Sequence, residues 1–230
     1  MSHADKTFDF TTCLMSSAHD IKNSLSMLIN TLENITATSD ARTIPFGEDI
    51  ARMEYEAKRA NNNLIQLLGL YKLTHTDFAP NLEPCNLEDF LDEIVIEYEP
   101  LFRFNRIEAE TGCDEELEWY FDRGLVNSII NNVLNNQVRY GKGRVRLTAD
   151  EEDGYLVLRI HDNGAGYPEH MLGQADFSQN PMNHQTGGTG LGLYFSTMAA
   201  RAHARNGRQG RIEISNDSDL GGGCFTIYIP

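Results

Sequence analysis

The sequence predicts an α+β fold, in which a helical hairpin forming a dimeric four-helix bundle precedes an α/β sandwich domain. Two apolar series with heptad spacing near the N-terminus predict the hairpin. Short alternating apolar segments, together with a glycine-rich stretch that opens a helix, predict the second domain. We expect the hairpin over residues 8–77, a linker over residues 78–85 and the second domain over residues 86–230.

Each helix of the expected hairpin carries a narrow apolar seam. The steps between successive apolar residues alternate between four and three along both series. Pro45 and Gly47 mark the connection between the two helices. Because two narrow seams cannot enclose a core alone, we expect a homodimer, and a single-chain coiled-coil stalk is the alternative. The first series is Leu14, Ala18, Ile21, Leu25, Leu28, Leu32 and Ile35, and the second is Ile50, Met53, Ala57, Ala60, Leu64, Leu67 and Tyr71.

His19 follows the seam residue Ala18 and is therefore expected on the flank of the bundle, exposed to solvent. Asp20 is adjacent to it, and Asn23 lies one helical turn further along the same face. An exposed imidazole beside a carboxylate that can orient or deprotonate it has the chemistry of a nucleophile. A surface histidine without a function is the alternative, and this region alone does not decide between them.

The amino-acid composition argues against some classes of binding partner. The 230 residues contain 19 Lys and Arg against 34 Asp and Glu, and the net charge of −15 argues against nucleic acid or an anionic membrane as a partner. No run of about 18 apolar residues occurs, so we expect no membrane span. The polar N-terminus lacks the apolar core of a signal peptide, and the four cysteines are scattered without a C-x-x-C pair, as in a cytoplasmic protein.

The second domain is expected to combine helices with short strands. Asn86 is a suitable N-cap for a helix that begins near Leu87 and has acidic residues in its first turn. Asp122–Tyr140 has the apolar spacing of another helix, and Glu151–Gly154 is expected to be a hairpin turn. Alternation predicts strands at Ile107–Glu110, Leu117–Phe121, Arg144–Ala149, Tyr155–His161, Arg211–Ser215 and Cys224–Ile229.

Asparagines are frequent on the expected helix Asp122–Tyr140, although asparagine is a mediocre helix former. Asn132 and Asn136 are four residues apart and share one face, with Arg139 and Tyr140 one turn further along. Neutral oxygens on one face suit a hard cation such as Mg²⁺, which also takes phosphate oxygens and water, and Arg139 could reach phosphate. A polar face in contact with solvent is the alternative interpretation.

Asp162 stands at the end of an expected strand and is followed by Gly164 and Gly166. A carboxylate in this position can accept a hydrogen bond from an amino group, while the glycines admit a flat ring. An Asp-Asn-Gly turn that binds no ligand is the alternative. The next segment, Met171–Thr186, is polar and irregular around Phe177, and we expect it to form a mobile lid over the pocket.

A glycine-rich loop, which includes Gly188, Gly190 and Gly192 with Leu191 between the last two, runs into an Ala- and Leu-rich helix. The glycines let the backbone approach a ligand closely. The start of the helix supplies unpaired N–H groups and the positive end of a dipole, which suit a phosphate. An ordinary glycine turn is the alternative. No Gly-x-x-x-x-Gly-Lys sequence occurs, so a P-loop is excluded.

In their order and spacing these segments resemble the core of a bacterial sensor histidine kinase, over nearly the whole chain from about residue 8. The second domain resembles the ATP-binding fold shared with DNA gyrase, the ninety-kilodalton heat-shock chaperone and the mismatch-repair ATPases. The segments that carry the resemblance are a phosphoacceptor box at His19–Asn23, an N box at Asn132 and Asn136, a first glycine box at Asp162, Gly164 and Gly166, an F box at Phe177, a second glycine box at Gly188, Gly190 and Gly192, and a final strand that ends at Pro230.

The resemblance implies roles on the hairpin. His19 would accept the γ-phosphoryl group of ATP, with Asp20 as the general base. Asn23 would help a water molecule attack the phospho-aspartate of a partner, so a phosphatase activity is also implied. These three residues are the catalytic residues that we expect.

The resemblance also implies a nucleotide site in the second domain. Two departures from the family pattern bear on nucleotide affinity: Gln137 stands where such kinases usually have alanine, and the lid from Phe177 to Gln185 is short. The implied roles are Mg²⁺ coordination by Asn136 with support from Asn132, a phosphate path lined by Arg139 and Tyr140, adenine recognition by Asp162, and nucleotide contacts from Gly164, Gly166, Phe177, Gly188, Gly190, Leu191 and Gly192.

We therefore expect a dimeric histidine kinase that uses Mg-ATP to phosphorylate His19 and passes the phosphoryl group to the receiver domain of a response regulator. Because few residues precede the hairpin, we expect the signal to come from a separate sensor protein or a small ligand. A phosphotransfer adaptor with the same fold but no use of ATP is one alternative, although the retained Asp162 and glycine loop argue against it. A protein-serine kinase or an ATPase on the same nucleotide fold is another.

Overall fold

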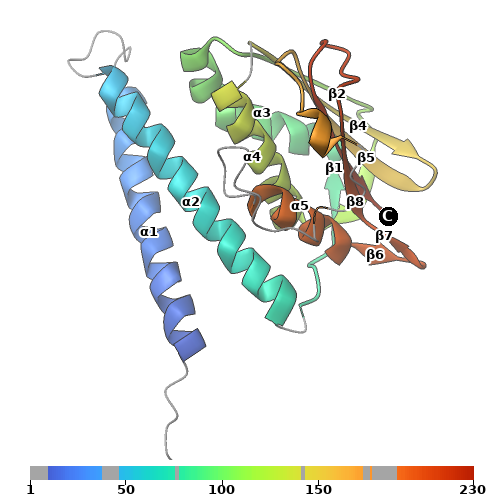
Figure 1. The fold of residues 1–230 in the computed structure, drawn as a ribbon, viewed down its shortest axis with the longest axis horizontal. Coiled ribbons are helices and arrows are strands. Elements are labelled where there is room, and N and C mark those ends of the chain that lie inside the picture. The colour runs from blue at the N-terminus through green and yellow to red at the C-terminus, as the bar shows by residue number, and fades with distance from the viewer. Residues whose placement is uncertain (1–9, 38–46, 76–77, 141–142, 173–176, 178–190) are drawn as a thin grey trace, which may run out of the picture. The chain divides into compact units, whose positions relative to one another are not determined.

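The structure is a computed structural model of the 230-residue chain (Figure 1). Contacts between residues group the chain into two compact units, one ending at Leu68 and the other beginning at Gly69. The structure describes residues 10–37, 47–75, 78–140, 143–172, 177 and 191–230.

The first unit is built on a pair of helices, α1 (Phe10–Ala37) and α2 (Gly47–His75), which run side by side in opposite directions (Figure 1). Its small apolar core consists of Ile29, Leu32 and Ala57, with Ile50 packed against them. An ion pair of 2.7 Å between Lys58 Nζ and Glu33 Oε1 also joins the helices. In the part of the chain that the structure describes, no helix combines the length and apolar content needed to cross a membrane.

One half of the heptad seam of α1 stays exposed. Leu32 is buried in the core of the hairpin, and Leu25, one heptad earlier, is half-buried. In contrast, Ile21, Leu28 and Ile35, also spaced by seven residues, are 53%, 43% and 40% exposed. On α2, Met53 and Leu67 are exposed as well. The hairpin of a single chain therefore leaves a stripe of large apolar side chains in contact with water.

The second unit contains a five-stranded sheet with the order β2–β4–β5–β9–β8. The pairing of β2 with β4 is parallel and the other pairings are antiparallel. Asp153 and Gly154, both with positive φ, form the tight turn between β4 and β5, and this confirms the expected hairpin. The strands are β2 (Glu108–Cys113), β4 (Arg144–Glu152), β5 (Tyr155–Asp162), β8 (Arg211–Ser215) and β9 (Cys224–Ile229).

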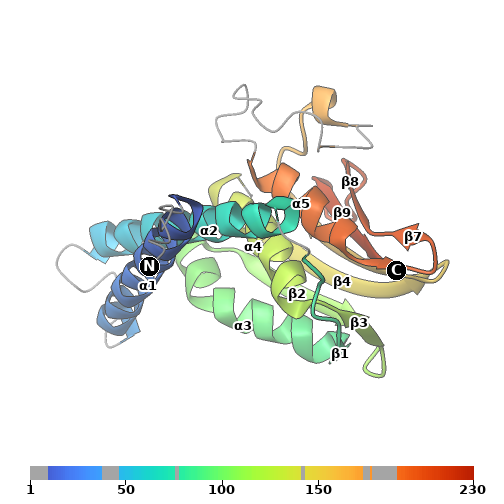
Figure 2. The ribbon, with the colours of Figure 1, turned by 90° about the horizontal axis from the view of Figure 1, so that it is seen from below.

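Three helices cover one face of this sheet (Figure 2). They are α3 (Leu87–Asn105), α4 (Arg123–Tyr140) and α5 (Leu191–Ala202). Their apolar faces meet the sheet in one core, whose fully buried members include Phe90, Leu134, Leu147, Phe195 and Phe225. Helices on one side and a mixed sheet on the other confirm the expected α+β fold class.

The start of α3 follows the sequence expectation. The Oδ1 of Asn86 accepts a hydrogen bond of 3.0 Å from the backbone N–H of Asp89, which is the N-cap arrangement. Glu88 and Asp89 place negative charge in the first turn, where the helix dipole favours it.

Several short elements were not expected from the sequence. Glu83–Asn86 forms a strand, β1, that pairs antiparallel with β3 (Glu118–Phe121) in a separate two-stranded sheet. The proline inside β1 hid it from pattern analysis, since proline is tolerated only where a strand is unpaired on one side. The remaining short elements are β6 (Ala204–Arg205), β7 (Arg208–Gln209) and the 3₁₀ turn η1 (Glu169–Met171).

Candidate functional site

Asp162, the last residue of β5, is the centre of a hydrogen-bond network in the second unit. Only 5% of the residue is exposed. Its Oδ1 accepts the backbone N–H groups of Gly164 at 2.6 Å and Gly223 at 3.2 Å, and its Oδ2 accepts the side-chain Nε2–H of Gln137 at 2.7 Å. The carboxylate is therefore held in one orientation by donors from three separate parts of the chain.

The loop between β8 and β9 packs tightly around Asp162. The backbone N–H of Asp162 donates to the carbonyl of Gly223 at 2.9 Å, and its own carbonyl accepts from Ser218 Oγ at 2.8 Å. A Cβ atom at Gly222 would lie 2.5 Å from Gly164 N and 2.6 Å from Asp162 Oδ1. Since Cβ atoms do not approach other atoms so closely, only glycine fits at this position.

The turn that follows Asp162 is fixed from the same loop. Asn216 brackets the backbone of Tyr167, because its Oδ1 accepts from the Tyr167 N–H at 2.6 Å and its Nδ2 donates to the Tyr167 carbonyl at 3.0 Å. Gly166 has a φ of +75°, and a Cβ there would lie 2.5 Å from Asn216 Oδ1. Burial raises the pKa of the Tyr167 hydroxyl, which is therefore neutral.

Asn132 joins α4 to the beginning of α5. The side chain is half-buried, and its Nδ2 donates to Ser196 Oγ at 3.4 Å. A Cβ at Gly192 would lie 2.3 Å from Asn132 Oδ1, so the backbone of α5 approaches the asparagine amide directly. Asn136, one turn further along α4, is exposed. The two asparagines thus differ in environment: one is packed between helices, and the other faces solvent.

The polar side chains of α4 fit a magnesium ion that takes most of its ligands from groups outside this helix. Asn136 offers an accessible neutral oxygen, the kind of ligand that Mg²⁺ accepts beside phosphate oxygens and water. Among the residues that the structure describes, no group of three or more His, Cys, Asp or Glu side chains could hold a metal ion. An ion at Asn136 would therefore depend on a phosphorylated ligand for the rest of its coordination.

Some of the other residues that the sequence predicts at the site lie outside the described ranges, and for two more only the side chains do. Gly188 and Gly190 fall outside them, and Leu191 and Gly192 are the first two residues of α5. Arg139 and Tyr140 are the last two residues of α4, and their side chains also fall outside the described part. Gly164 contributes its N–H to Asp162. Phe177 is buried in the apolar core of the second unit.

His19 lies on α1 in the first unit with an exposed imidazole ring. Its Nδ1 is 4.0 Å from Asp20 Oδ1 and 3.2 Å from the amide Nδ2 of Asn23, one helical turn away. Both contacts involve the same ring nitrogen. The arrangement leaves Nε2 as the nitrogen available to a reaction partner.

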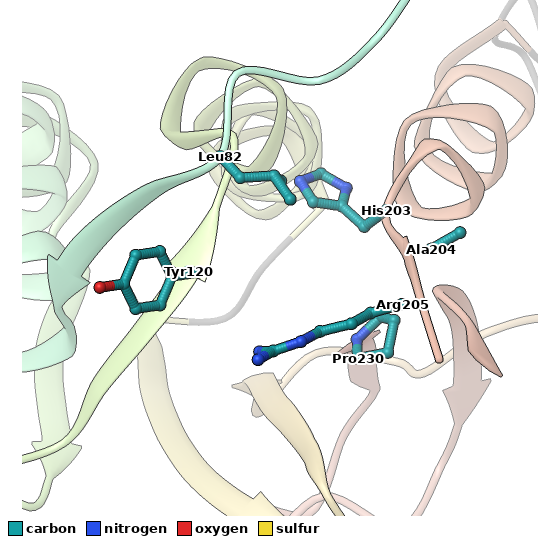
Figure 3. A pocket seen from close by; sticks show the side chains of 6 residues that line it. All are labelled: Leu82, Tyr120, His203, Ala204, Arg205 and Pro230. Carbon is teal, nitrogen blue, oxygen red and sulfur yellow. The ribbon is translucent and has the colours of Figure 1, made fainter. Parts of the chain in front are cut away.

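Figure 3 shows a separate pocket of about 220 Å³, lined by Leu82, Tyr120, His203, Ala204, Arg205 and Pro230. None of these residues was expected at a site from the sequence. The Nε2 of His203 accepts the backbone N–H of Asp122 at 3.0 Å, and its Nδ1–H donates to the carbonyl of Ala199 at 2.9 Å. Burial lowers the pKa of His203, so the ring is neutral and connects the end of α5 to the start of α4.

Sequence analysis missed the residues that hold Asp162 in place. Gln137 was noted only as a departure from the family pattern, and neither Asn216 nor Ser218 was considered for the site. The run Gly221–Gly223 was a visible signal, since consecutive glycines often mark a close approach of two backbone segments. Nothing in the local sequence indicates that Asp162 is the group they approach, because the contacts span about 60 residues.

Comparison with known proteins relates this part of the chain to a family of ATP-binding domains. Residues 121–230 match the family described as histidine kinase-, DNA gyrase B-, and HSP90-like ATPase. The sensor histidine kinase RppB of Synechocystis is 23% identical over 93% of this chain and 47% of its own length. The histidine protein kinase SaeS of Staphylococcus aureus is 24% identical over 92% of this chain and 61% of its own length. The chain thus spans about half the length of these relatives.

Solved structures share the fold. Full-length ShkA, in complex with AMPPNP, superposes with a TM-score of 0.65 at 20% identity, over 95% of this chain and 45% of that one. The Acinetobacter baumannii histidine kinase AdeS superposes with a TM-score of 0.60 at 18% identity, over 90% of this chain and 96% of that one. These likenesses show that the chain shares the fold of these two proteins.

A first prediction concerns the packing of the β8–β9 loop on Asp162. Gly222→Ala should lower the free energy of unfolding by about 1–3 kcal/mol, because the new methyl group overlaps Gly164 and Asp162. Gly112→Ala is the matched control, since its Cβ would meet only Thr148 Cγ2 at an ordinary 3.5 Å. It should change stability by less than about 0.5 kcal/mol. Urea unfolding followed by circular dichroism measures both, and equal stabilities would contradict the close packing.

A second prediction concerns pH. Because burial lowers the folded-state pKa of His203, the unfolded chain binds a proton more readily as the pH falls below about 6.5. Stability contributed by the neutral ring is present above that pH and declines below it, by at most about 1.4 kcal/mol per pH unit. His203→Gln should flatten this decline, whereas His170→Gln, at an exposed histidine, should leave it unchanged. Urea unfolding between pH 5 and 7.5 tests this, and identical slopes for all three proteins would contradict it.

Proposed function

We propose that this chain is an ATP-dependent protein-histidine kinase of a two-component system, because residues 121–230 match an ATPase family that includes histidine kinases and its relatives are named histidine kinases. It transfers the γ-phosphoryl group of Mg-ATP to His19 and then to an aspartate in the receiver domain of a response regulator. The observation that carries the proposal is the occurrence, in one chain, of this core and of an exposed histidine beside a carboxylate on a helical hairpin.

The second unit supplies the groups that bind the nucleotide. Asp162 presents a carboxylate, fixed by backbone donors, to the amino group of the base. The beginning of α5 offers N–H groups and the positive end of a helix dipole to the phosphates. Asn136 provides an oxygen for Mg²⁺, and Asn132 positions the start of α5. Magnesium supplies neutralisation of phosphate charge when it is bound.

The first unit supplies the nucleophile. In the neutral tautomer with the proton on Nδ1, the lone pair of His19 Nε2 attacks the γ-phosphorus and the bond from phosphorus to the ADP oxygen breaks. Asp20, 4.0 Å from Nδ1, accepts that proton as the ring becomes positively charged. Asn23 holds the same proton when its amide is turned with Oδ1 toward the ring. The same amide can position a water molecule for the phosphatase reaction on a regulator.

A second copy of the hairpin is the proposed partner of the exposed apolar stripe. Ile21, Leu28 and Ile35 repeat every seven residues, which is the spacing that packs helices in a bundle. Two copies that meet along this stripe form a four-helix bundle and bury the side chains that one hairpin leaves in water. A separate sensor protein is the proposed source of the signal.

The kinase proposal predicts phosphorylation at one histidine. Incubation with γ-labelled Mg-ATP should label the chain, and His19→Gln should reduce the label to background because the accepting nitrogen is lost. His170→Gln, at another exposed histidine, is the matched control and should label as the unmodified chain does. The label should be lost in acid and retained in base, as for phosphohistidine. Labelling of His19→Gln at the normal level would rule the proposal out, and an acid-stable label would favour a serine kinase.

The second candidate function is a phosphotransfer adaptor that keeps the fold and does not use ATP. The hydrogen bond from Gln137 to Asp162 favours it, because the carboxylate proposed to bind the base already holds a donor from the protein. A direct titration with Mg-ATP separates the two functions, since the adaptor binds no nucleotide.

If the chain is a kinase, the titration should also identify the magnesium ligand. Asn136→Ala should weaken Mg-ATP binding by about tenfold and leave binding of metal-free nucleotide unchanged, because one oxygen ligand of the ion is lost. Asn127→Ala is the matched control, since that position lies nine residues earlier on the opposite face of α4. Equal affinities of the two variants for Mg-ATP would remove Asn136 from the metal site.

A further inference from the structure

The hydrogen bond between Gln137 and Asp162 is a feature of the second unit that the proposed kinase mechanism does not use. Gln137 lies on α4 and is 9% exposed, and Asp162 lies at the end of β5 and is 5% exposed. The bond of 2.7 Å joins Nε2 of the glutamine to Oδ2 of the carboxylate. The other oxygen, Oδ1, accepts from the backbone of Gly164 and Gly223. Within the described residues, Gln137 is thus the side-chain donor to this carboxylate.

We propose that Gln137 occupies the hydrogen-bonding position of a base's amino group and so determines the affinity and base selectivity of the nucleotide site. The inference rests on the proposed function, in which Asp162 accepts from that amino group. A carboxamide NH₂ and the 6-amino group of adenine are both planar nitrogen donors with similar hydrogen-bond geometry. With Asp162 almost completely buried, a ligand donor reaches Oδ2 only when the Gln137 side chain moves aside.

The energetic consequence is an exchange of one hydrogen bond for another. When an amino group displaces the Gln137 amide, the number of donors on the buried carboxylate does not change, so this contact adds little to affinity. The glutamine must also find new partners for its own amide after it moves. A nucleotide that lacks the amino group leaves Gln137 where it is and loses nothing at Asp162. The site therefore distinguishes poorly between purines with and without a 6-amino group.

Removal of the Gln137 side-chain amide should have the opposite effect on the selectivity between purines. In Gln137→Ala the carboxylate loses its side-chain donor, and a bound amino group then satisfies an otherwise incompletely paired buried charge. The smaller side chain also opens the volume of the carboxamide to the base. The variant should consequently bind adenine nucleotides more tightly and reject nucleotides without the amino group.

The test is calorimetric titration of the full chain with Mg-ATP and with the magnesium complex of purine riboside triphosphate, in which hydrogen replaces the 6-amino group. The unmodified chain should bind the two with affinities within about threefold of each other. Gln137→Ala should bind Mg-ATP about tenfold more tightly and prefer it to the purine nucleotide by roughly tenfold, the equivalent of one charge-assisted hydrogen bond. Gln209→Ala, at an exposed glutamine, is the control and should behave as the unmodified chain.

The outcomes separate this inference from the proposed function. If the unmodified chain binds Mg-ATP, and Gln137→Ala binds it no more tightly or shows the same preference between the two nucleotides, the inference is overturned. The proposed kinase function then still stands. Binding by Gln137→Ala alone supports the inference and overturns ATP use by the native chain. Binding by neither protein overturns both. Thermal unfolding shows whether Gln137→Ala is folded. If that variant is unfolded, Gln137→Ser, which keeps a small polar group, is used in the same titrations.

Discussion

A carboxylate that is almost completely buried needs hydrogen-bond donors from the protein in place of water. Asp162 is such a carboxylate, and several segments of the second unit meet at it to supply those donors. The donors come from α4, from the turn after β5 and from the loop between β8 and β9, which are separated in sequence. An unpaired charge at this depth would cost several kcal/mol, so these segments are constrained to meet at one point. The glycines at 222 and 223 follow from the same constraint, because a side chain there would displace the carboxylate.

The elements of the second unit were largely predictable because they rest on local patterns. Strand alternation located β4, β5, β8 and β9, and the cap at Asn86 located the start of α3. The two-stranded sheet of β1 and β3 was not predicted, because β1 is short, contains a proline and is defined by a partner over 30 residues away. Local propensity carries no information about such a pairing.

The residues of the candidate site also divide into those that local sequence predicts and those that depend on distant contacts. Asp162 and the asparagines of α4 were identifiable from residue type and spacing, since the chemistry of carboxylates and amides is local. The contact of Gln137 with Asp162 was not, because it joins residues 25 positions apart in the sequence. Asn132 illustrates a third case: its spacing from Asn136 predicts that it supports a metal ligand, and the structure adds a contact with Gly192 and Ser196 that the spacing does not predict. That contact became visible only once the two helices were placed together.

The two units bury their apolar surface to different extents, and this difference bears on function. The second unit encloses a core with many fully buried side chains, whereas the hairpin leaves half of the α1 seam in water. A stripe of exposed Ile and Leu is unfavourable in a single chain, at about 25 cal/mol per Å² of apolar surface, and becomes favourable when a second surface covers it. His19 lies two residues before Ile21, the first exposed residue of that stripe. A partner that covers the stripe therefore also decides which face of the His19 helix remains open to a nucleotide or a regulator.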